Sequence, residues 1–196
     1  MNSTSHTHTE GESCCSGPWL QPSVHQTLDE IDFERGIWSD ACYGNTEEII
    51  RKLNRGNRIC TVNSVDSSGY TALHYASRNG HLSTCEALVM QGANVNCQTA
   101  SGKSTPLHRA AYRGHRLVVK YLLSKKANPM ICDADGKTAL HKAAENGHTE
   151  ILKELLENSP ALKSITDNKG KTAFQYVSHD KQDAIEIFNS FLDDNH

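Results

Sequence analysis

Histidine and cysteine are the side chains of this chain best suited to bind a soft metal ion or to act in catalysis, and 11 histidines and 7 cysteines are present. Their densest group joins His6 and His8 to the adjacent Cys14 and Cys15. Zinc sites use these residue types, but in CxxC and HxxxH spacings that this group lacks, and adjacent cysteines are poor co-ligands. We therefore predict no metal and no cofactor. A metal- or redox-responsive role for this segment stays as the alternative function, which zinc titration would test.

Six other histidines recur at a regular interval, three after a leucine and three after a glycine: His74, His108, His141, His81, His115 and His148. A metal site needs unlike residues that converge on one point, whereas regular recurrence indicates the same structural task each time. We predict side-chain hydrogen bonds to the backbone that link neighbouring turns. The chain also lacks a Gly-x-Ser-x-Gly motif, a phosphate-binding loop and a dinucleotide fingerprint, so no enzyme is predicted.

The elements that carry these histidines are themselves repeated. A Thr-x-Leu-His core begins at Thr71, Thr105 and Thr138 and returns in eroded form at Thr172, in steps of 34, 33 and 34 residues. A fixed period in this range marks a stacked array, because one unit cannot bury its apolar face alone. The Thr-Pro-Leu-His-x-Ala core at this period resembles the ankyrin repeat. The resemblance covers roughly residues 32–192 and implies an all-α solenoid of helix-turn-helix units with short β-hairpin fingers.

Each residue of the repeated core has a physical task. Thr105 is predicted to be a helix N-cap, its hydroxyl accepting from a first-turn backbone N–H, and Pro106 takes the first helical position. Gly114 is predicted to end that helix in the left-handed conformation. The apolar stripe within residues 118–123 then predicts a second, returning helix.

The period also divides the chain. Residues 1–22 hold too little apolar surface to order themselves and are expected to be a flexible tail, followed by a leading segment, 23–31. The array then spans 32–192, and residues 193–196 are expected to fray. Its approximate repeats are 32–65, 66–98, 99–132, 133–166 and 167–192. The first lacks the Thr-x-Leu-His start and the last replaces histidine with Gln175, so we predict about three full repeats between degenerate caps.

The finger of the third repeat departs from the pattern. Asp-x-x-Gly turns open the neighbouring fingers at Asp66, Asp133 and Asp167. In the third finger Gln98 replaces the turn aspartate, and one extra residue, Lys103 or Ser104, precedes the helix. A further extra residue lies within 158–162. We interpret both insertions as loop variation that leaves the stack intact.

Composition excludes several classes of function. The net charge is −3, with 20 basic and 23 acidic residues, so no global basic field indicates nucleic acid. No apolar run reaches the roughly 18 residues of a membrane span. The N-terminus lacks the basic and apolar regions of a signal peptide, and an odd number of irregularly spaced cysteines fits free thiols. We expect an intracellular monomer in the cytoplasm, the nucleus or both.

The resemblance further implies that a partner protein is gripped by the fingertips and the adjoining face of the first helices. Carried onto this sequence, that surface comprises Ser67, Ser68, Tyr70, Arg78, Asn79, Ser101, Lys103, Arg109, Tyr112, Arg113, Asp135, Lys137, Lys142, Glu145, Asn146, Asn168, Lys169 and Lys171. Eight of these are basic and two acidic, although the whole chain leans acidic. The expected function is a non-enzymatic adaptor, scaffold or inhibitor that binds an acidic or phosphorylated segment; a solvated face with a chance charge bias is the alternative.

Asn96 carries one further expectation. Together with Leu88, eight residues upstream, it resembles the finger asparagine of ankyrin repeats that asparaginyl hydroxylases modify. The equivalent position of the third repeat is Met130, so only one such site is expected. A finger asparagine that bonds its own turn is the alternative interpretation.

Overall fold

The computed structural model describes residues 36–55, 61–178 and 182–193. The predicted tail (1–22), with its histidines and its two adjacent cysteines, and the leading segment (23–31) lie outside the described residues, as do the last three residues, 194–196.

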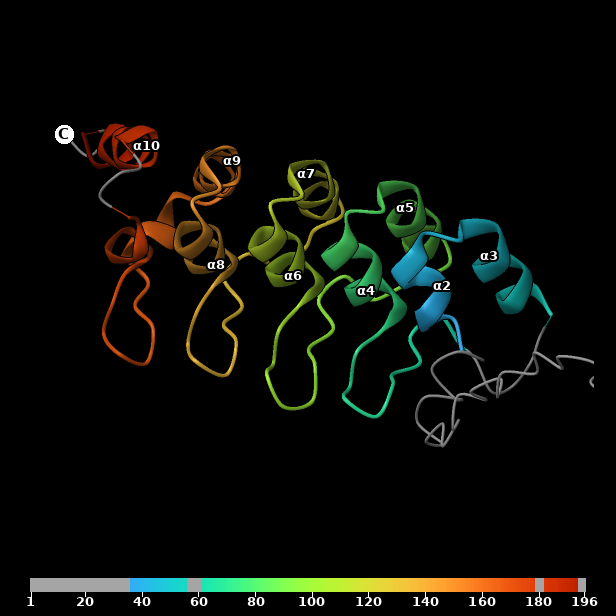
Figure 1. Ribbon diagram of the computed structural model, residues 1–196. Helices are drawn as coiled ribbons and strands as arrows, with labels where there is room; N and C mark the ends of the chain where they lie inside the picture. The colour runs from blue at the N-terminus through green and yellow to red at the C-terminus, as the bar shows by residue number, and fades with distance from the viewer. Residues whose placement is uncertain (1–35, 56–60, 179–181, 194–196) are drawn as a thin grey trace, which may run out of the picture.

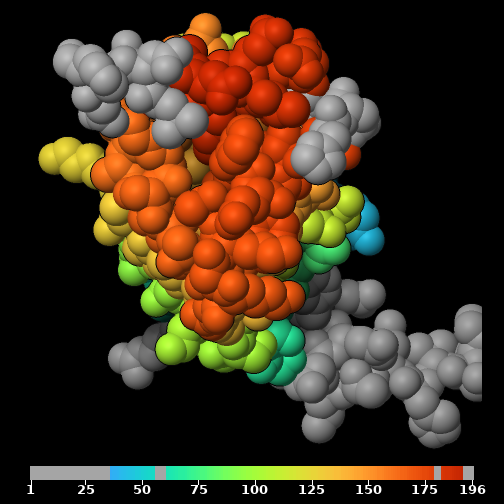
Figure 2. All heavy atoms as spheres, turned by 90° about the vertical axis from the view of Figure 1, so that its left-hand side faces the viewer, coloured from blue at the N-terminus to red at the C-terminus, as the bar shows by residue number. Residues whose placement is uncertain are grey.

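The described helices form two rows (Figure 1). The first helices of successive repeats are α2 (Trp38–Tyr43), α4 (Ala72–Asn79), α6 (Pro106–Arg113), α8 (Ala139–Asn146) and the 3₁₀ helix η2 (Ala173–Tyr176). The second helices are α3 (Thr46–Asn54), α5 (Leu82–Met90), α7 (Arg116–Ser124), α9 (Thr149–Asn158) and α10 (Gln182–Asp193), and a 3₁₀ helix η1 (Pro160–Ser164) follows α9. Extended fingers project from the ends of the first helices. Figure 2 looks along the stack from its C-terminal end. The predicted all-α array of stacked helix pairs is confirmed.

The helix ends have the predicted chemistry. Thr105 Oγ1 accepts from the backbone N–H of His108 at 3.4 Å, and Pro106 occupies the first turn of α6. Gly114 ends α6 in the left-handed conformation, with φ 82°. The hydroxyl therefore satisfies one first-turn N–H, and the glycine lets the chain turn into the second helix.

The core lies between the two rows. Small buried residues such as Ala76, Ala110 and Ala143 let neighbouring first helices approach closely, while Leu122 and Leu155 pack from the second helices. The helices α2, α4, α6 and α8 each contact the next first helix along the array and also their own second helix. Stability therefore comes mainly from contacts between adjacent units, as in other repeat arrays.

The fingers and the last repeat differ in detail from the repeat pattern. Among the described residues the fingers hold isolated β-bridges, Val65 with Thr71 and Thr166 with Thr172, and no longer strand. In the last repeat the first helix is a short 3₁₀ helix rather than an α-helix, and the chain becomes extended at Val177 (ψ 126°). No glycine follows there to end a longer helix, since the sequence continues Val177-Ser178-His179.

The prediction that Gln98 replaces the turn aspartate of the third finger is wrong. In neighbouring fingers the aspartate N–H donates to the residue before the N-cap threonine, as Asp133 N does to Lys137 O at 2.9 Å. In the third finger the donor is Thr99 N, which bonds Ser104 O at 3.0 Å. Lys103 absorbs the extra residue at a positive φ of 47°, so the finger register shifts by one.

Candidate partner-binding face

The histidines that follow a leucine join each first helix to the next finger. The backbone N–H of Thr71 donates to Nδ1 of His74 at 3.1 Å, so this nitrogen carries no proton and Nε2 donates to Ser104 O at 2.9 Å. His108 makes the same bond to Lys137 O at 2.9 Å, and His141 to Lys171 O at 3.1 Å. Burial lowers the pKa of His74 and of His108 to about 4, which keeps both rings neutral.

The histidines that follow a glycine tie each second helix to the preceding repeat. His81 Nε2 bonds Cys42 O, His115 Nε2 bonds Arg78 O, and His148 Nε2 bonds Tyr112 O, at 2.9 to 3.1 Å. The structural role predicted for both sets is thereby confirmed. Within residues 36–55, 61–178 and 182–193 no three His, Cys, Asp or Glu side chains are grouped to hold a metal ion.

The repeat register defines one continuous surface, which we call the groove face. Positions four, seven and eight after Thr71, Thr105 and Thr138 share one side of α4, α6 and α8, because residues three and four apart are helical neighbours. This face comprises the residues at those positions and the residues of the adjoining fingertips. The residues predicted for partner binding belong to it, and the equivalent Tyr75 and Tyr176, which the sequence analysis omitted, belong to it as well.

Most of the predicted residues are exposed on this surface: Ser67, Ser68, Arg78, Ser101, Lys103, Tyr112, Arg113, Asp135, Glu145, Asn146, Asn168, Lys169 and Lys171. The others are half-buried: Tyr70, Asn79, Arg109, Lys137 and Lys142. The structure thus brings side chains from four successive repeats onto one side of the array.

Two predicted residues also hold the stack together. Asn79 Nδ2 donates to Cys42 O at 2.8 Å, which ties α4 to α2. Asn168 Nδ2 donates to Ala134 O at 3.0 Å, which ties the last finger to the one before it. A substitution at either position would therefore disturb the array as well as its surface.

At position four, most side chains of the groove face are bound by the aspartate of their own finger. Tyr75 Oη donates to Asp66 Oδ2 at 2.6 Å, and Tyr176 Oη donates to Asp167 Oδ2 at 2.5 Å. Lys142 Nζ lies 2.7 Å from Asp133 Oδ2. Burial alone would raise the pKa of Asp133, but the Lys142 ammonium and backbone N–H groups lower it below its usual range.

The third repeat is the exception, because Thr99 stands where the finger aspartate would be. Arg109, at position four, turns instead to the preceding finger, where its guanidinium carbon lies 4.8 Å from the ring centroid of Tyr70 and Nη2 bonds the Tyr70 hydroxyl. Between the fourth and last repeats the finger supplies the cation and the helix supplies the ring: Nζ of Lys137, on the fourth finger, lies 4.5 Å from the ring centroid of Tyr176.

The basic residues of the groove face fall into two groups. Lys137 pairs with Glu145 and Lys142 with Asp133, so their charges are largely balanced. The remaining six form no ion pair within the part of the chain that the structure describes: Arg78, Lys103, Arg109, Arg113, Lys169 and Lys171. The face therefore keeps an excess of positive charge on a chain whose net charge is −3.

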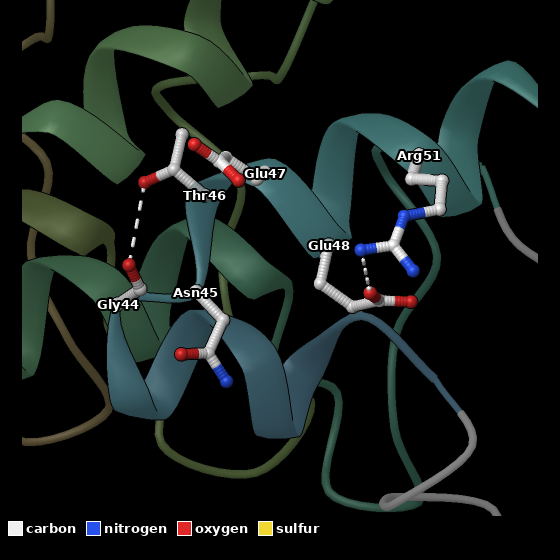
Figure 3. A pocket seen from close by; sticks show the side chains of 6 residues that line it. All are labelled: Gly44, Asn45, Thr46, Glu47, Glu48 and Arg51. Atoms are coloured by element: carbon white, nitrogen blue, oxygen red, sulfur yellow. Dashed lines mark hydrogen bonds and ion pairs between the residues drawn. The ribbon is translucent and has the colours of Figure 1, made fainter.

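Three open hollows formed by the described residues lie away from the groove face. One, of about 570 Å³, lies where α2 turns into α3, between Gly44 and Arg51 (Figure 3). There Arg51 and Glu48 point toward each other and pair at 2.7 Å. Two others lie between second helices, one between α9 and α10 and one between α7 and α9. None of the three is lined by the residues predicted for partner binding.

Comparison with known proteins agrees with this architecture. The family model described as ankyrin repeats (3 copies) matches residues 38–133 and 107–194. Ankyrin repeat domain-containing protein 39 of Homo sapiens is 49% identical over 86 residues, which is 44% of this chain and 45% of that protein. The protein of the same name from Bos taurus is 53% identical over 68 residues, 35% of this chain and 36% of that protein. The chain thus spans less than half the length of both.

A third relative is matched over most of its length. The Notch-regulated ankyrin repeat-containing protein of Homo sapiens is 40% identical over 114 residues, which is 58% of this chain and 88% of that protein. Among the described residues, no helix combines the length and apolar character that a membrane crossing requires.

Proposed function

Since this chain belongs to the ankyrin-repeat family, a family of protein–protein interaction modules, we propose that it is a non-enzymatic adaptor, scaffold or inhibitor that binds a partner protein through the groove face. The partner segment that we propose is acidic or phosphorylated. We further propose that it acts in the cytoplasm or the nucleus, where the free thiols of Cys42, Cys85, Cys97 and Cys132 would stay reduced.

One observation carries the proposal. Arg78 and Arg113 are exposed near the ends of α4 and α6, on one side of the array, and neither has a carboxylate partner among the described residues. Unpaired cations on an otherwise acidic chain attract an anionic partner, and complementary charge speeds association and sets specificity.

A pull-down with charge-reversed variants tests this function. The double variant Arg78→Glu and Arg113→Glu is expected to abolish capture of the partner from cell lysate. Its melting midpoint should fall by no more than about 4 °C, because both side chains are exposed and a glutamate in the last turn of a surface helix costs at most about 1 kcal/mol. The matched control reverses Lys120 and Lys153, which are exposed on the second helices. Equal losses from both double variants, or no loss from either, would place the contact surface elsewhere.

A further inference from the structure

The third repeat breaks a rule that the neighbouring repeats follow. In the second, fourth and last repeats a finger aspartate binds the position-four side chain of its own first helix, namely Tyr75, Lys142 and Tyr176. In the third, Thr99 is 3% exposed and its Oγ1 accepts from the N–H of Ser104, so it offers Arg109 no carboxylate. Among these four repeats, the third is the one whose position-four side chain, the cation Arg109, has no finger aspartate to bind it.

Arg109 is nevertheless held in a fixed place. Its guanidinium stacks on Tyr70 and bonds the hydroxyl of that residue. Tyr70 is itself packed edge-on against His74, with ring centroids 5.6 Å apart. The Nε–H of Arg109 is buried and finds no acceptor among the described residues. An arginine that is oriented but not neutralised loses little further freedom when it binds an anion.

Three other cations of the groove face lie on the same helix as Arg109, on the adjacent helix or on the finger of the same repeat. Arg113 follows it by one turn of α6, and Arg78 lies at position seven of the adjacent helix α4. Lys103 is exposed on the third finger, held at a positive φ by the extra residue. These three side chains and Arg109 are defined here as the arginine cluster.

Two of the carboxylates nearest to the arginine cluster along the repeats are neutralised by lysines: Asp133 pairs with Lys142, and Glu145 pairs with Lys137. Asp66 accepts hydrogen bonds from neutral groups, among them Tyr75 Oη, and Asp135 forms no ion pair among the described residues. The four cations of the cluster outnumber these two remaining carboxylates, so the cluster keeps an excess of positive charge, and the extra negative charge that would balance it has to come from another molecule.

We propose that the arginine cluster is a carboxylate-binding site that receives an aspartate or glutamate side chain from an extended acidic segment of a partner protein. The partner supplies from outside the negative charge that finger aspartates supply from inside in the neighbouring repeats. Arg109 and Arg113 bind the carboxylate by paired N–H donors, as guanidinium groups do, while Lys103 and Arg78 attract its neighbours. This inference rests on the proposed function and adds to it the place and the chemistry of recognition.

A peptide titration tests the site directly. The probe is a fluorescein-labelled decapeptide of alternating Glu and Ala, with a Gln and Ala peptide as its neutral control, measured by fluorescence anisotropy at low ionic strength. Thr99→Asp restores the missing finger carboxylate without removing any cation, and we expect it to weaken binding of the Glu peptide by about fivefold or more. Arg109→Gln should weaken it similarly.

The reciprocal variant is Asp133→Asn. In the wild type, Asp133 Oδ1 accepts hydrogen bonds from the N–H groups of Asp135 and Lys137 at 3.0 and 2.9 Å. The amide oxygen of the asparagine can still accept both. The change releases Lys142 from its ion pair, so binding of the Glu peptide should strengthen by about threefold. This variant keeps the test valid if Thr99→Asp fails to fold, which a melting curve reveals.

Arg116 is the matched control, because it lies on α7 and is already paired with Glu150 and Glu154 at 3.2 and 2.8 Å. Arg116→Gln should leave peptide affinity unchanged. In an NMR titration, the side-chain Nε–H signal of Arg109 should shift and that of Arg116 should not. Unchanged affinity in folded Thr99→Asp, equal losses in the Arg109 and Arg116 variants, or binding of a phosphoserine peptide but not of the Glu peptide would overturn the carboxylate site.

The pull-down separates failure of this inference from failure of the proposed function. Capture that is lost on reversal of Arg78 and Arg113 but unaffected by Thr99→Asp would refute the carboxylate site and leave the groove face as the binding surface. Capture that none of these variants changes would refute the proposed function itself.

Discussion

The ring of His148 lies directly against Gly114: a β-carbon built on the glycine would come within 2.7 Å of the histidine Cε1 atom. The same glycine has a φ of 82°, a conformation that β-branched residues resist. Gly114→Val should therefore lower the free energy of unfolding by about 3 kcal/mol or more, from backbone strain and overpacking together. Urea denaturation measures this change.

Gly92 provides the control for that prediction. Its φ is 87°, but a β-carbon there meets no atom within 4 Å. Gly92→Ala should thus cost only the strain of the left-handed conformation, about 1 kcal/mol. Similar losses from both variants, or an unchanged midpoint for Gly114→Val, would show that contact with His148 does not fix this glycine.

Acid should destabilise the array through its buried histidines. Burial lowers the pKa of His74 and of His108 from 6.5 to about 4, so between those values the unfolded chain binds more protons than the folded one. Stability is then fully present above pH 6.5 and is lost as the pH falls toward 4. At pH 5 each of the two histidines should lower the free energy of unfolding by roughly 2 kcal/mol relative to its value above pH 6.5. Urea denaturation at several pH values would detect this change.

The last repeat suggests the control variant for this acid effect. There Gln175 replaces the histidine, and its Oε1 accepts from the N–H of Thr172 at 2.9 Å. His108→Gln keeps such an acceptor but cannot titrate. The acid dependence of its unfolding free energy should be clearly flatter than that of wild type; an equally steep dependence would assign the acid effect to other groups.

The part of this fold that could be predicted from the sequence is the part that repeats with the period of 33 or 34 residues. Thr105, His108 and Gly114 do the same task in each full repeat, so recurrence alone indicates their roles. The partner of Arg109 could not be predicted in this way, because Lys103 absorbs an extra residue at a positive φ and moves Thr99 into the aspartate position. Departures from periodicity depend on backbone geometry, which counting residues does not reveal.

The finger asparagines are a second case in which the position of a residue within the repeat did not predict its structural role. Asn96 was expected to be the only such site, yet Asn63 is its structural equivalent: Asn63 Oδ1 accepts from Asn94 N, and Asn96 Oδ1 from Asn128 N, both at 2.8 Å. The asparagine that bonds its own turn is Asn94, whose Oδ1 accepts from Asn96 N at 3.0 Å. Asn96 instead links two neighbouring fingers.

We predict that an asparaginyl hydroxylase adds one oxygen atom to Asn96. The hydroxylation motif found at Asn96 includes Leu88, whereas Arg55 holds the corresponding position upstream of Asn63. The Asn63 peptide is therefore the internal control and should stay unmodified. Mass spectrometry of the digested protein after incubation with the enzyme measures both peptides, and an unmodified Asn96 peptide would end the proposal.

Binding of the partner should depend on salt. The cations of the groove face are mostly exposed, so added salt screens them over a Debye length of about 8 Å at physiological ionic strength. The association rate should fall several-fold between low salt and about 0.3 M salt, while the dissociation rate changes little. Surface plasmon resonance separates the two rates, and an association rate that is indifferent to salt would argue against recognition by charge.

Tyr70 and Tyr112, two of the four tyrosines of the groove face, should respond differently to substitution. Tyr112 is 46% exposed at the end of α6, so Tyr112→Ala should weaken partner binding about tenfold or more while leaving the melting midpoint nearly unchanged. Tyr70 is half-buried and stacks on Arg109, so Tyr70→Ala should weaken binding and also lower stability by about 1 kcal/mol. Calorimetry of binding and of unfolding measures both effects. If Tyr112→Ala bound as wild type does, the exposed ring would be a solvated side chain rather than an anchor for the partner.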